Sequence, residues 1–562
     1  ARVLVDNKDE LGKGSLFYYL RHALKLLPND IGIFAVFTDT ISNISNFSPA
    51  SKHDQSPRVA TGRAELFKPF YLIDTVDINV DHKKASTLKD SECPQSFFMY
   101  GRPLWSSLTL SPFDNVKGFE PHDIINLAME KLVGGMAYTW WKKEYKNKIS
   151  SVESLAILGP RLCIDIVPQS EYASDLVSSY MRLCLKISDD RKSIITSMPT
   201  EPVLAEASAQ IMNDPDINLI ELINSLTSAL KNGAVEGGYR GELVARLLLL
   251  KAWDDVYEKL DVPSTRIHYS RFITLSEFLK SLLADNAYKK IALRLQERVS
   301  FTGTEFGQAY IKFTHFISIT YTPDRKDLLD ALIRGVAFSC KRNQEGADII
   351  IPMYIGALNE EPSTDRISYI LIQVKNWAKN IKGGDYPLSA TVSLSPASVG
   401  IEQLPHMPFL SLYMQLGSSK GFSEDPSGTV ETKGAVKRKH KIDEVLQDYN
   451  TDCDDTRDRF LKRIRTKLSE DTSDVKKEPN KDVLDDASDA EIVTFQRYFQ
   501  IPLAVFGLSS EVYGCLEQAT THTSVIGGDL KSSFKQLLTA WVDPTLGGNS
   551  EEVEIVKRME PM

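Results

Sequence analysis

The sequence feature that most constrains the fold is an apolar run that ends in a polar pair. Residues 366–380 read RISYILIQVKNWAKN, and the first half of this segment is mostly β-branched, aromatic or leucine. Such a run is typical of a buried strand. Because strand side chains alternate between faces, Gln373 and Lys375 are expected to point the same way while Val374 stays in the core. The sequence therefore predicts a buried strand that carries an amide and an ammonium at its carboxyl end.

Length and composition bound the class of protein. The chain has 562 residues, is 42% hydrophobic and 25% charged, and carries a net charge of −9. The length suggests roughly three to four domains in an α/β chain. The longest apolar runs, such as residues 31–37, are far shorter than the ~18 residues of a membrane span, so no membrane partner is expected. The net charge argues against a globally basic nucleic-acid-binding protein, but it is compatible with a local basic cleft.

Cysteine usage and short signals bear on localisation. The six cysteines occur singly, without a CxxC motif, which predicts no zinc site and a reducing, intracellular compartment. The run KRKHK at residues 437–441 fits nuclear localisation or contact with a polyanion, although short basic runs are also common by chance. No secretory signal opens the chain. Because the chain begins at Ala1 within a strand-like stretch, we interpret it as a fragment or processed product, and an upstream targeting signal would not be visible.

The pattern divides the chain into four parts. Residues 1–115 alternate strand-like and helix-like pieces (RVLVD, SLFYYLRHALKLL, GIFAVFTDT), which indicates βαβ units and a parallel sheet. Residues 116–230 read as a helical extension, with a winged-helix-like arrangement as one option. Residues 420–490 contain 18 acidic and 15 basic residues and three aromatic ones, so we predict a disordered insertion. Residues 231–419 and 491–545 would form one domain around it.

The predicted domain that surrounds this insertion has a defined order of elements. Residues 236–260 form the strongest predicted helix, apolar almost all the way round and therefore buried. A second helix is expected over residues 325–338 and a strand over residues 347–356. The strand within residues 366–380 follows, and strand-like order returns at residues 498–508 after the insertion. We therefore predict a helix followed by two hairpin-connected strands.

Four residues on these elements form a recognisable layout: Glu242 on the helix, Asp348 at the start of one strand, and Gln373 and Lys375 at the end of the next. Phosphodiester cleavage needs a divalent cation to neutralise the phosphate and lower the pKa of a water. Mg²⁺, or Mn²⁺ in its place, binds one or two carboxylates plus neutral oxygens. Glu242 and Asp348 would hold the metal, assisted by the side-chain carbonyl of Gln373 and the backbone carbonyl of Val374. Lys375 would orient the attacking water or stabilise developing charge.

Each residue also has a purely structural interpretation. Asp348 follows Gly346 and suits a turn at a strand start. Glu242 can pair with Arg246 one helical turn later, and Lys375 can simply end a strand in solvent. The ordered set nevertheless favours the catalytic interpretation, because a weak motif is strengthened by its predicted structural context.

The sequence resembles a known family at these positions. The segments GYRGELVARLLLLKAWD, EGADIIIPMYIG, YILIQVKN and IPLAVFGLSSEVYGCL resemble the restriction-endonuclease-like domain of large fungal protein families related to Crinkler effectors. The Asp…Gln-x-Lys pattern is similar to that of Mrr-type enzymes within the PD-(D/E)xK nucleases. The resemblance implies a mixed sheet flanked by helices and a Mg²⁺-dependent endonuclease acting on DNA. Gln373 departs from the acidic form and removes one carboxylate, which weakens the expected metal affinity.

The front half resembles the rear of the P-loop NTPase module, with its helical extension, that precedes the nuclease in such proteins. The segments are VFTDTISNISNFSP, LFKPFYLIDTVD, YGRPLW, LAILGPRLCIDI and MPTEPVLAEAS. The resemblance places Asp6 at the end of a Walker B-like strand and Asp39 at a sensor-like strand end, although both also fit ordinary strand–loop junctions. No GxxxxGK(S/T) phosphate loop is present, so we expect no NTP hydrolysis from this chain alone.

The sequence thus predicts an intracellular, nuclear α/β protein with a C-terminal metal-dependent nuclease domain behind an incomplete NTPase-like module. Nucleic acid, specifically DNA, would be its partner, a choice that rests on fold analogy. One alternative is a catalytically silent effector that uses the nuclease fold as a binding scaffold, and another is a nucleotide-driven switch. His315, among aromatic residues, is expected to be a core histidine. The central spatial prediction is that the side chains of Asp348 and Lys375 converge at one cation pocket.

Overall fold

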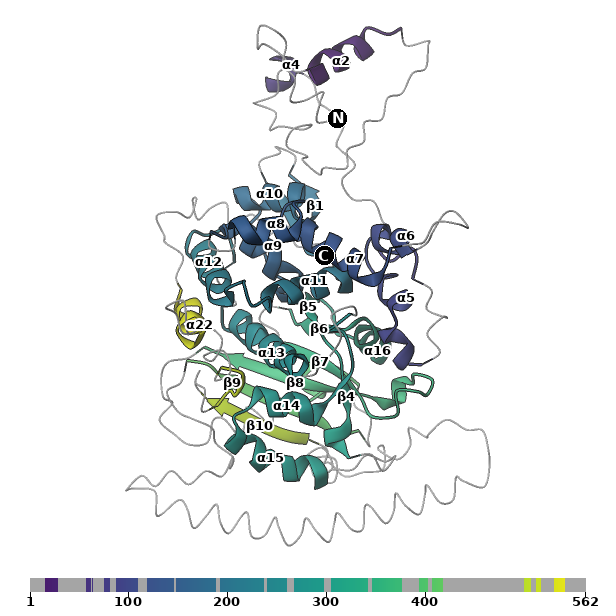
Figure 1. Ribbon diagram of the computed structural model, residues 1–562, viewed down its shortest axis with the longest axis vertical. Helices are drawn as coiled ribbons and strands as arrows, with labels where there is room; N and C mark the ends of the chain where they lie inside the picture. Colours follow the sequence, from purple (N-terminus) through teal and green to yellow (C-terminus); the bar gives the residue numbers. More distant parts are fainter. Residues whose placement is uncertain are drawn as a thin grey trace.

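The computed structural model describes most of the middle of the chain and shorter pieces towards both ends (Figure 1). The described residues are 16–28, 57–61, 63, 75–80, 87–109, 119–145, 148–188, 193–236, 240–259, 267–297, 305–341, 346–376, 394–402, 407–417, 500–506, 512–516 and 530–540. The predicted strands around Asp6 and Asp39, the charged insertion 420–490 and its basic run 437–441 lie outside these residues.

A mixed sheet forms the centre of the lower half of the molecule in Figure 1. Two of its central strands, β7 and β8, are antiparallel to each other, and β9 and β10 run parallel to β8. The strands are β3 (Ile273–Thr274), β4 (Tyr310–Ile311), β5 (His315–Ser318), β6 (Val336–Ser339), β7 (Ile349–Tyr354), β8 (Ile367–Lys375), β9 (Phe409–Gln415) and β10 (Gln500–Phe506). Their order is β10-β9-β8-β7-β4-β3, and β6 pairs with both β5 and β7. The protein is therefore α/β, as predicted.

Both faces of the sheet are covered by helices. In β8 the side chains of Ile370, Ile372 and Val374 belong to the larger buried cluster, whereas those of Tyr369 and Leu371 belong to a smaller one on the opposite face. Helix α13 (Arg240–Glu258) contributes its leucines to the larger cluster, and α16 (Arg325–Arg334) contributes Leu328, Leu329 and Leu332 to the smaller one. The alternation predicted for this strand is confirmed.

One predicted helix ends well before its predicted boundary. The buried helix expected over 236–260 is α13, and the strand expected over 498–508 contains β10. The helix predicted over 325–338 is too long, because α16 ends at Arg334 and residues 336–339 form β6. Gly335 has a φ of +81° and caps the helix in the left-handed conformation, which releases the following apolar residues into the sheet.

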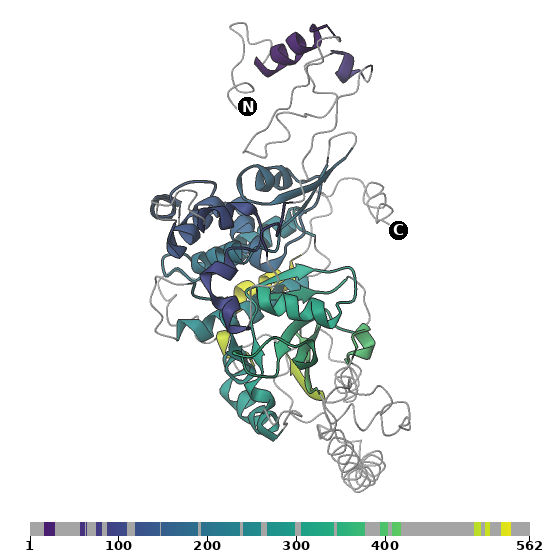
Figure 2. The ribbon, with the colours of Figure 1, turned by 90° about the vertical axis from the view of Figure 1, so that its right-hand side faces the viewer.

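Residues 121–231 are mostly helical and lie above the sheet in Figure 1. Their elements are α7 (Pro121–Leu132), α8 (Tyr138–Tyr145), α9 (Ser151–Leu162), α10 (Glu171–Ser179), the hairpin strands β1 (Leu183–Ile187) and β2 (Ile194–Ser197), α11 (Pro202–Met212) and α12 (Leu219–Lys231). Three further helices, α14 (Leu275–Leu282), α15 (Asp285–Glu297) and α22 (Leu530–Thr539), pack around α13 and the sheet. Figure 2 shows the helical group and the sheet stacked along the long axis.

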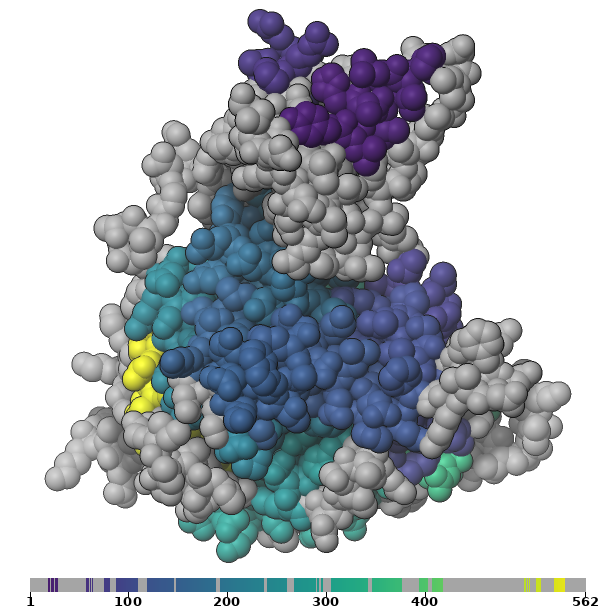
Figure 3. Space-filling model, turned by 45° about the horizontal axis from the view of Figure 1, so that its top comes forward, coloured from purple at the N-terminus to yellow at the C-terminus, as the bar shows by residue number. Residues whose placement is uncertain are grey.

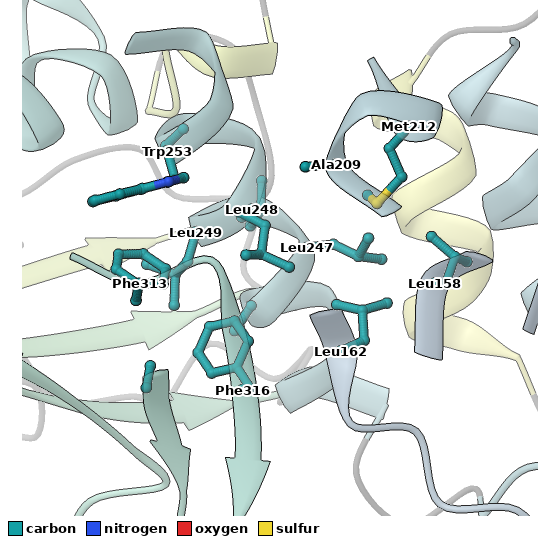
Figure 4. Packing of buried hydrophobic residues seen from close by; sticks show 14 of the residues in the cluster. Leu158, Leu162, Ala209, Met212, Leu247, Leu248, Leu249, Trp253, Phe313 and Phe316 are labelled. Atoms are coloured by element: carbon teal, nitrogen blue, oxygen red, sulfur yellow. The ribbon is translucent and has the colours of Figure 1, made fainter. Parts of the chain in front are cut away.

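One hydrophobic core runs through the helical group and the sheet. Leu158 and Leu162 of α9 and Met212 of α11 pack with the leucines of α13, and the same cluster continues to Trp253 and Phe313 next to the sheet (Figure 4). Trp253 and Phe313 have ring centroids 4.7 Å apart. The core is therefore continuous across residue 230, where the sequence analysis drew a domain boundary.

Residues 87–109 join the same body. They contain η3 (Lys89–Glu92), α5 (Pro94–Phe97) and α6 (Pro103–Thr109), and Trp105 is fully buried in the larger cluster. Leu88 is buried in the smaller cluster, which also contains the leucines of α16. The space-filling view in Figure 3 shows this segment in contact with the helical group.

Two short helices belong to the front of the chain. The helix expected near residue 20 is α2 (Leu16–Lys25), and α4 (Pro57–Ala60) is the other described element there. In the described part of the chain no helix is both long enough and apolar enough to cross a membrane.

Candidate functional site

The predicted site residues lie at one edge of the sheet. β5 and β6 are parallel, β7 runs against both β6 and β8, and β8, β9 and β10 are parallel. The carboxyl ends of these five strands therefore meet the start of β7 at the same edge. In α/β sheets this edge is where polar side chains and ligands gather.

Asp348 is fixed just before β7, where the backbone ladder stops. The last paired residues are Ile349 and Ile372, and beyond them the Asp348 amide donates to the Ile372 carbonyl at 2.8 Å. The Asp348 carbonyl accepts a hydrogen bond from the Cys340 amide at 2.9 Å. The carboxylate itself accepts one from the Val374 amide, with 2.6 Å between Oδ2 and N. The carboxylate is thus held against the end of β8.

The Lys375 ammonium lies within electrostatic range of this carboxylate. Burial raises the pKa of Asp348 above its ordinary value, while the Val374 amide and the Lys375 ammonium act in the opposite direction. Lys375 and Gln373 are both half-buried on the face of β8 opposite Val374. The structure therefore places Asp348, Gln373 and Lys375 at the same edge of the sheet, and the convergence of their side chains on one cation stays a prediction.

Gln373 is anchored by its amide nitrogen. Nε2 donates to the Gly346 carbonyl at 3.0 Å, which leaves the side-chain oxygen as the atom available to a ligand. Gly346 has a φ of +98°, and a Cβ at this position would lie 2.8 Å from Val399 Cγ1. Only glycine fits this turn, so the bond that orients Gln373 depends on it.

Glu242 arrives at the same edge from the other face of the sheet. It lies in the first turn of α13, directly after Gly241, which packs so tightly on the end of β8 that a Cβ there would lie 3.3 Å from that of Asn376. Burial raises the pKa of the Cys340 thiol to about 12, and the carboxylates of Asp348 and Glu242 both contribute. Both acids are therefore within electrostatic range of Cys340.

Two further residues at this edge were not identified from the sequence. Gln415 ends β9, pairs in register with Lys375 and is buried, so it lies on the same face as Gln373 and Lys375. The same signal that marked Gln373, an apolar strand ending in a polar residue, also exists in FLSLYMQ and could have indicated it. Cys340 had no such signal, because its proximity to Asp348, whose carbonyl accepts the Cys340 amide, depends on strand pairing.

The structural interpretations of these residues also find support. The Asp348 carboxylate and the Gln373 amide each satisfy a backbone group where the β7–β8 ladder opens, a role that buried backbone groups require. The Arg246 guanidinium donates to the carbonyls of Leu162 and Cys163 at the end of α9, and its Nε donates to the backbone carbonyl of Glu242 at 3.4 Å. This last bond involves the backbone, so the predicted pairing of the Glu242 carboxylate with Arg246 stays a prediction.

The oxygen donors at this edge suit a hard divalent cation. Mg²⁺ in proteins commonly takes one or two carboxylates and completes its shell with water and substrate phosphate. Asp348 and Glu242 would supply two carboxylates, and the side-chain oxygen of Gln373 would be a neutral ligand. Within the described residues no three His, Cys, Asp or Glu side chains form a metal-binding group. A Mg²⁺ or Mn²⁺ ion at this edge would therefore be held by few protein ligands.

His315 is a core residue, as predicted. Its side chain is fully buried, Nε2 lies 2.9 Å from Thr200 Oγ1, and Nδ1 lies 3.0 Å from Thr314 Oγ1. Burial, together with the charges of Arg334 and Arg161, lowers its pKa to about 3. The nucleotide-related predictions for Asp6 and Asp39 lie outside the described residues.

Comparison with family models gives two matches. Residues 143–453, more than half of the chain, match the model described as a domain of unknown function (DUF8736), and residues 1–73 match a second such domain (DUF8735). The larger match contains Glu242, Asp348, Gln373 and Lys375. No curated protein and no solved structure matches the chain. The protein therefore belongs to the DUF8736 family.

Proposed function

We propose that this protein is a metal-dependent nuclease that cleaves phosphodiester bonds in DNA at the edge formed by β7, β8 and the start of α13. The observation that supports the proposal is that the Asp348 carboxylate is held against the end of β8 by the Val374 amide, within electrostatic range of Lys375, while Gln373 and the first turn of α13 with Glu242 lie at the same edge. These residues come from three separate elements, and their order is that of the PD-(D/E)xK layout.

Each residue has a defined task in this reaction. A bound Mg²⁺ or Mn²⁺ supplies charge neutralisation at the phosphate and a more acidic water. Asp348 and Glu242 hold the cation, and the Gln373 oxygen adds a neutral ligand. Lys375 donates hydrogen bonds to the attacking water or to the phosphate oxygens as negative charge develops. The burial that raises the pKa of Asp348 also strengthens these interactions by lowering the local dielectric.

The fold is consistent with a restriction-endonuclease-like domain. A mixed sheet with α13 on one face and α16 on the other is what the resemblance implies. The kinship with Crinkler-related proteins and the incomplete NTPase-like module in front remain part of this proposal.

The test is a cleavage assay on plasmid DNA with Mg²⁺ or Mn²⁺, with single-stranded RNA as a second substrate. Asp348→Asn is the informative variant, because Asn keeps an oxygen that can accept the Val374 hydrogen bond but removes the charge needed for the metal. Lys375→Met removes the ammonium and keeps the stem. Lys280→Met, on the exposed side of α14, is the matched control.

We expect wild type and Lys280→Met to cleave and both site variants to lose at least 100-fold in rate, in line with loss of a catalytic charge. Equal cleavage by all four proteins would mean a contaminating nuclease. Cleavage of RNA alone would reassign the substrate while keeping the site.

A silent binding scaffold is the second candidate. The observation that favours it is that Asp348 and Gln373 both complete backbone hydrogen bonding at the open ladder end, which is a sufficient structural role for each. This alternative predicts no cleavage with any divalent metal. It also predicts that Asp348→Asn leaves nucleic-acid binding unchanged.

A further inference from the structure

Arg246 connects the helical group to the turn that carries Glu242. It lies one turn after Glu242 on α13 and is almost fully buried, with 2% of its surface exposed. Its Nη1 donates to the carbonyls of Leu162 and Cys163, and its Nε donates to the Glu242 carbonyl. Carbonyls at the end of a helix lack partners within that helix, so this side chain completes the C-terminus of α9.

A second arginine fixes α9 to α13 two turns further along. Arg161, in the last turn of α9, forms a bidentate pair with Asp254, with both N–O distances at 2.7 Å. Its Nε donates to the Thr314 carbonyl next to β5 at 2.9 Å. Because Arg246 and Asp254 are eight residues apart on α13, the end of α9 holds this helix at two points along its length. Figure 4 shows apolar side chains of α9 and α13 packed against one another.

The other side of the first turn of α13 is set by close packing. A Cβ on Gly241 would lie 3.3 Å from Asn376 Cβ and 3.5 Å from Val374 Cγ1, both at the end of β8. The backbone that carries Glu242 is therefore confined between β8 on one side and the arginine-capped end of α9 on the other. A change at either contact would move Glu242 relative to Asp348.

We propose that Arg246 is a positioning residue of the site: by joining the end of α9 to the first turn of α13, it sets where the Glu242 carboxylate stands. This inference rests on the proposed metal-dependent function. It makes the helical group, through α9, a necessary part of the catalytic unit, although the sequence suggested a separate extension.

The test uses Mn²⁺ affinity, measured by calorimetry on the full chain, in a double-mutant design. The variants are Arg246→Met, Arg246→Lys, Glu242→Gln and the combination of Arg246→Met with Glu242→Gln. Arg182→Met is the matched control, because Arg182 is also a buried arginine near the end of α9, but its hydrogen bonds go to Ile164 and Thr196.

Arg246→Met should weaken Mn²⁺ binding by roughly 10- to 100-fold, the usual effect of losing a group that orients a metal ligand. In the Glu242→Gln background the same change should have no further effect, because Arg246 acts through Glu242. Arg246→Lys keeps one donor and should restore part of the affinity. Cleavage by Arg246→Met should recover at saturating Mn²⁺, whereas Arg182→Met should bind Mn²⁺ as wild type does.

If Arg246→Met weakens Mn²⁺ binding equally in the wild-type and in the Glu242→Gln background, the inference is overturned. Unchanged Mn²⁺ affinity in a destabilised Arg246→Met protein would do the same, since it would reveal a purely structural role. If Arg246→Met does not fold, Arg246→Lys is compared with wild type instead. The shorter lysine side chain weakens the contacts with the carbonyls of Leu162 and Cys163, so a wild-type Mn²⁺ affinity in Arg246→Lys would refute the positioning role.

Failure of the proposed function gives a different result. A wild-type protein that neither binds Mn²⁺ nor cleaves DNA removes the basis of both proposals. A wild-type protein that binds and cleaves, beside an Arg246→Met variant with identical behaviour, removes only the inference about Arg246.

Discussion

Removal of the Asp254 carboxylate should be among the most destabilising single changes in the chain. Asp254 accepts two hydrogen bonds from Arg161 and one from Asn213, all at 2.7 Å, and the side chains of Asp254 and Arg161 are 2% and 0% exposed. Hydrogen bonds to a charged group contribute about 1.5–3 kcal/mol each. Loss of the two bonds from Arg161 therefore amounts to about 3–6 kcal/mol. The usual cost of breaking a buried ion pair, about 3–5 kcal/mol, agrees with this figure.

Equilibrium unfolding in urea measures the effect. We expect Asp254→Ala to lower the free energy of unfolding by about 4 kcal/mol, because among the described residues Arg161 would keep only the Thr314 carbonyl and the weakly accepting Met212 sulfur as partners for a buried charge. The free energy of unfolding should fall less in the double variant Arg161→Met, Asp254→Leu than in either single variant, because the double variant has no unpaired buried charge at this position.

Asp365→Ala is the matched surface control. Asp365 is 66% exposed at its side chain and lies 3.5 Å from Arg325, so its removal should cost less than about 1 kcal/mol. If Asp254→Ala costs no more than Asp365→Ala, the reasoning about the buried pair is wrong.

Three more predictions concern pH and backbone strain. Because burial raises the pKa of Asp348, the contribution of this group to the free energy of unfolding is present in acid and is lost as the pH rises through the folded-state pKa. Asp348→Asn should therefore raise the melting temperature at pH 8, and the difference from wild type should shrink towards pH 4. Thermal unfolding at several pH values measures this difference. Burial lowers the pKa of Lys312 to about 8, so the free energy of unfolding of wild type should rise by about 3 kcal/mol relative to that of Lys312→Met between pH 8 and 10.5. Urea titrations measure this difference, and the same pH dependence in both proteins would contradict it. Gly346→Ala should lower the free energy of unfolding by roughly 1–3 kcal/mol, because Gly346 has a positive φ and a Cβ there would contact Val399. An unchanged free energy of unfolding in urea would contradict this prediction.

Local patterns in the sequence predicted several elements of the fold. The alternation in β8 predicted which of its side chains face the core, because a buried strand has a period of two. The apolar surface of α13 predicted its burial for a similar reason. The end of α16 was placed too late, since its last helical turn and the following strand are both apolar and Gly335 was not recognised as the cap.

Features that depend on distant contacts could not be predicted. Arg161 and Asp254 are 93 positions apart, and Arg246 and Leu162 are 84 apart, so no local spacing links them. The electrostatic influence of Asp348 and Glu242 on Cys340 likewise depends on distant strand and helix packing. The continuous core across residue 230 has the same origin, because it is formed where α9 and α11 meet α13.

The most direct test of the account is a Mn²⁺ titration followed by electron paramagnetic resonance. The account predicts one bound Mn²⁺ per wild-type chain, no binding at that site in Asp348→Asn, and binding like that of wild type in Lys280→Met. Identical Mn²⁺ binding by wild type and Asp348→Asn, or no binding by either, would contradict the claim that this sheet edge is a cation site.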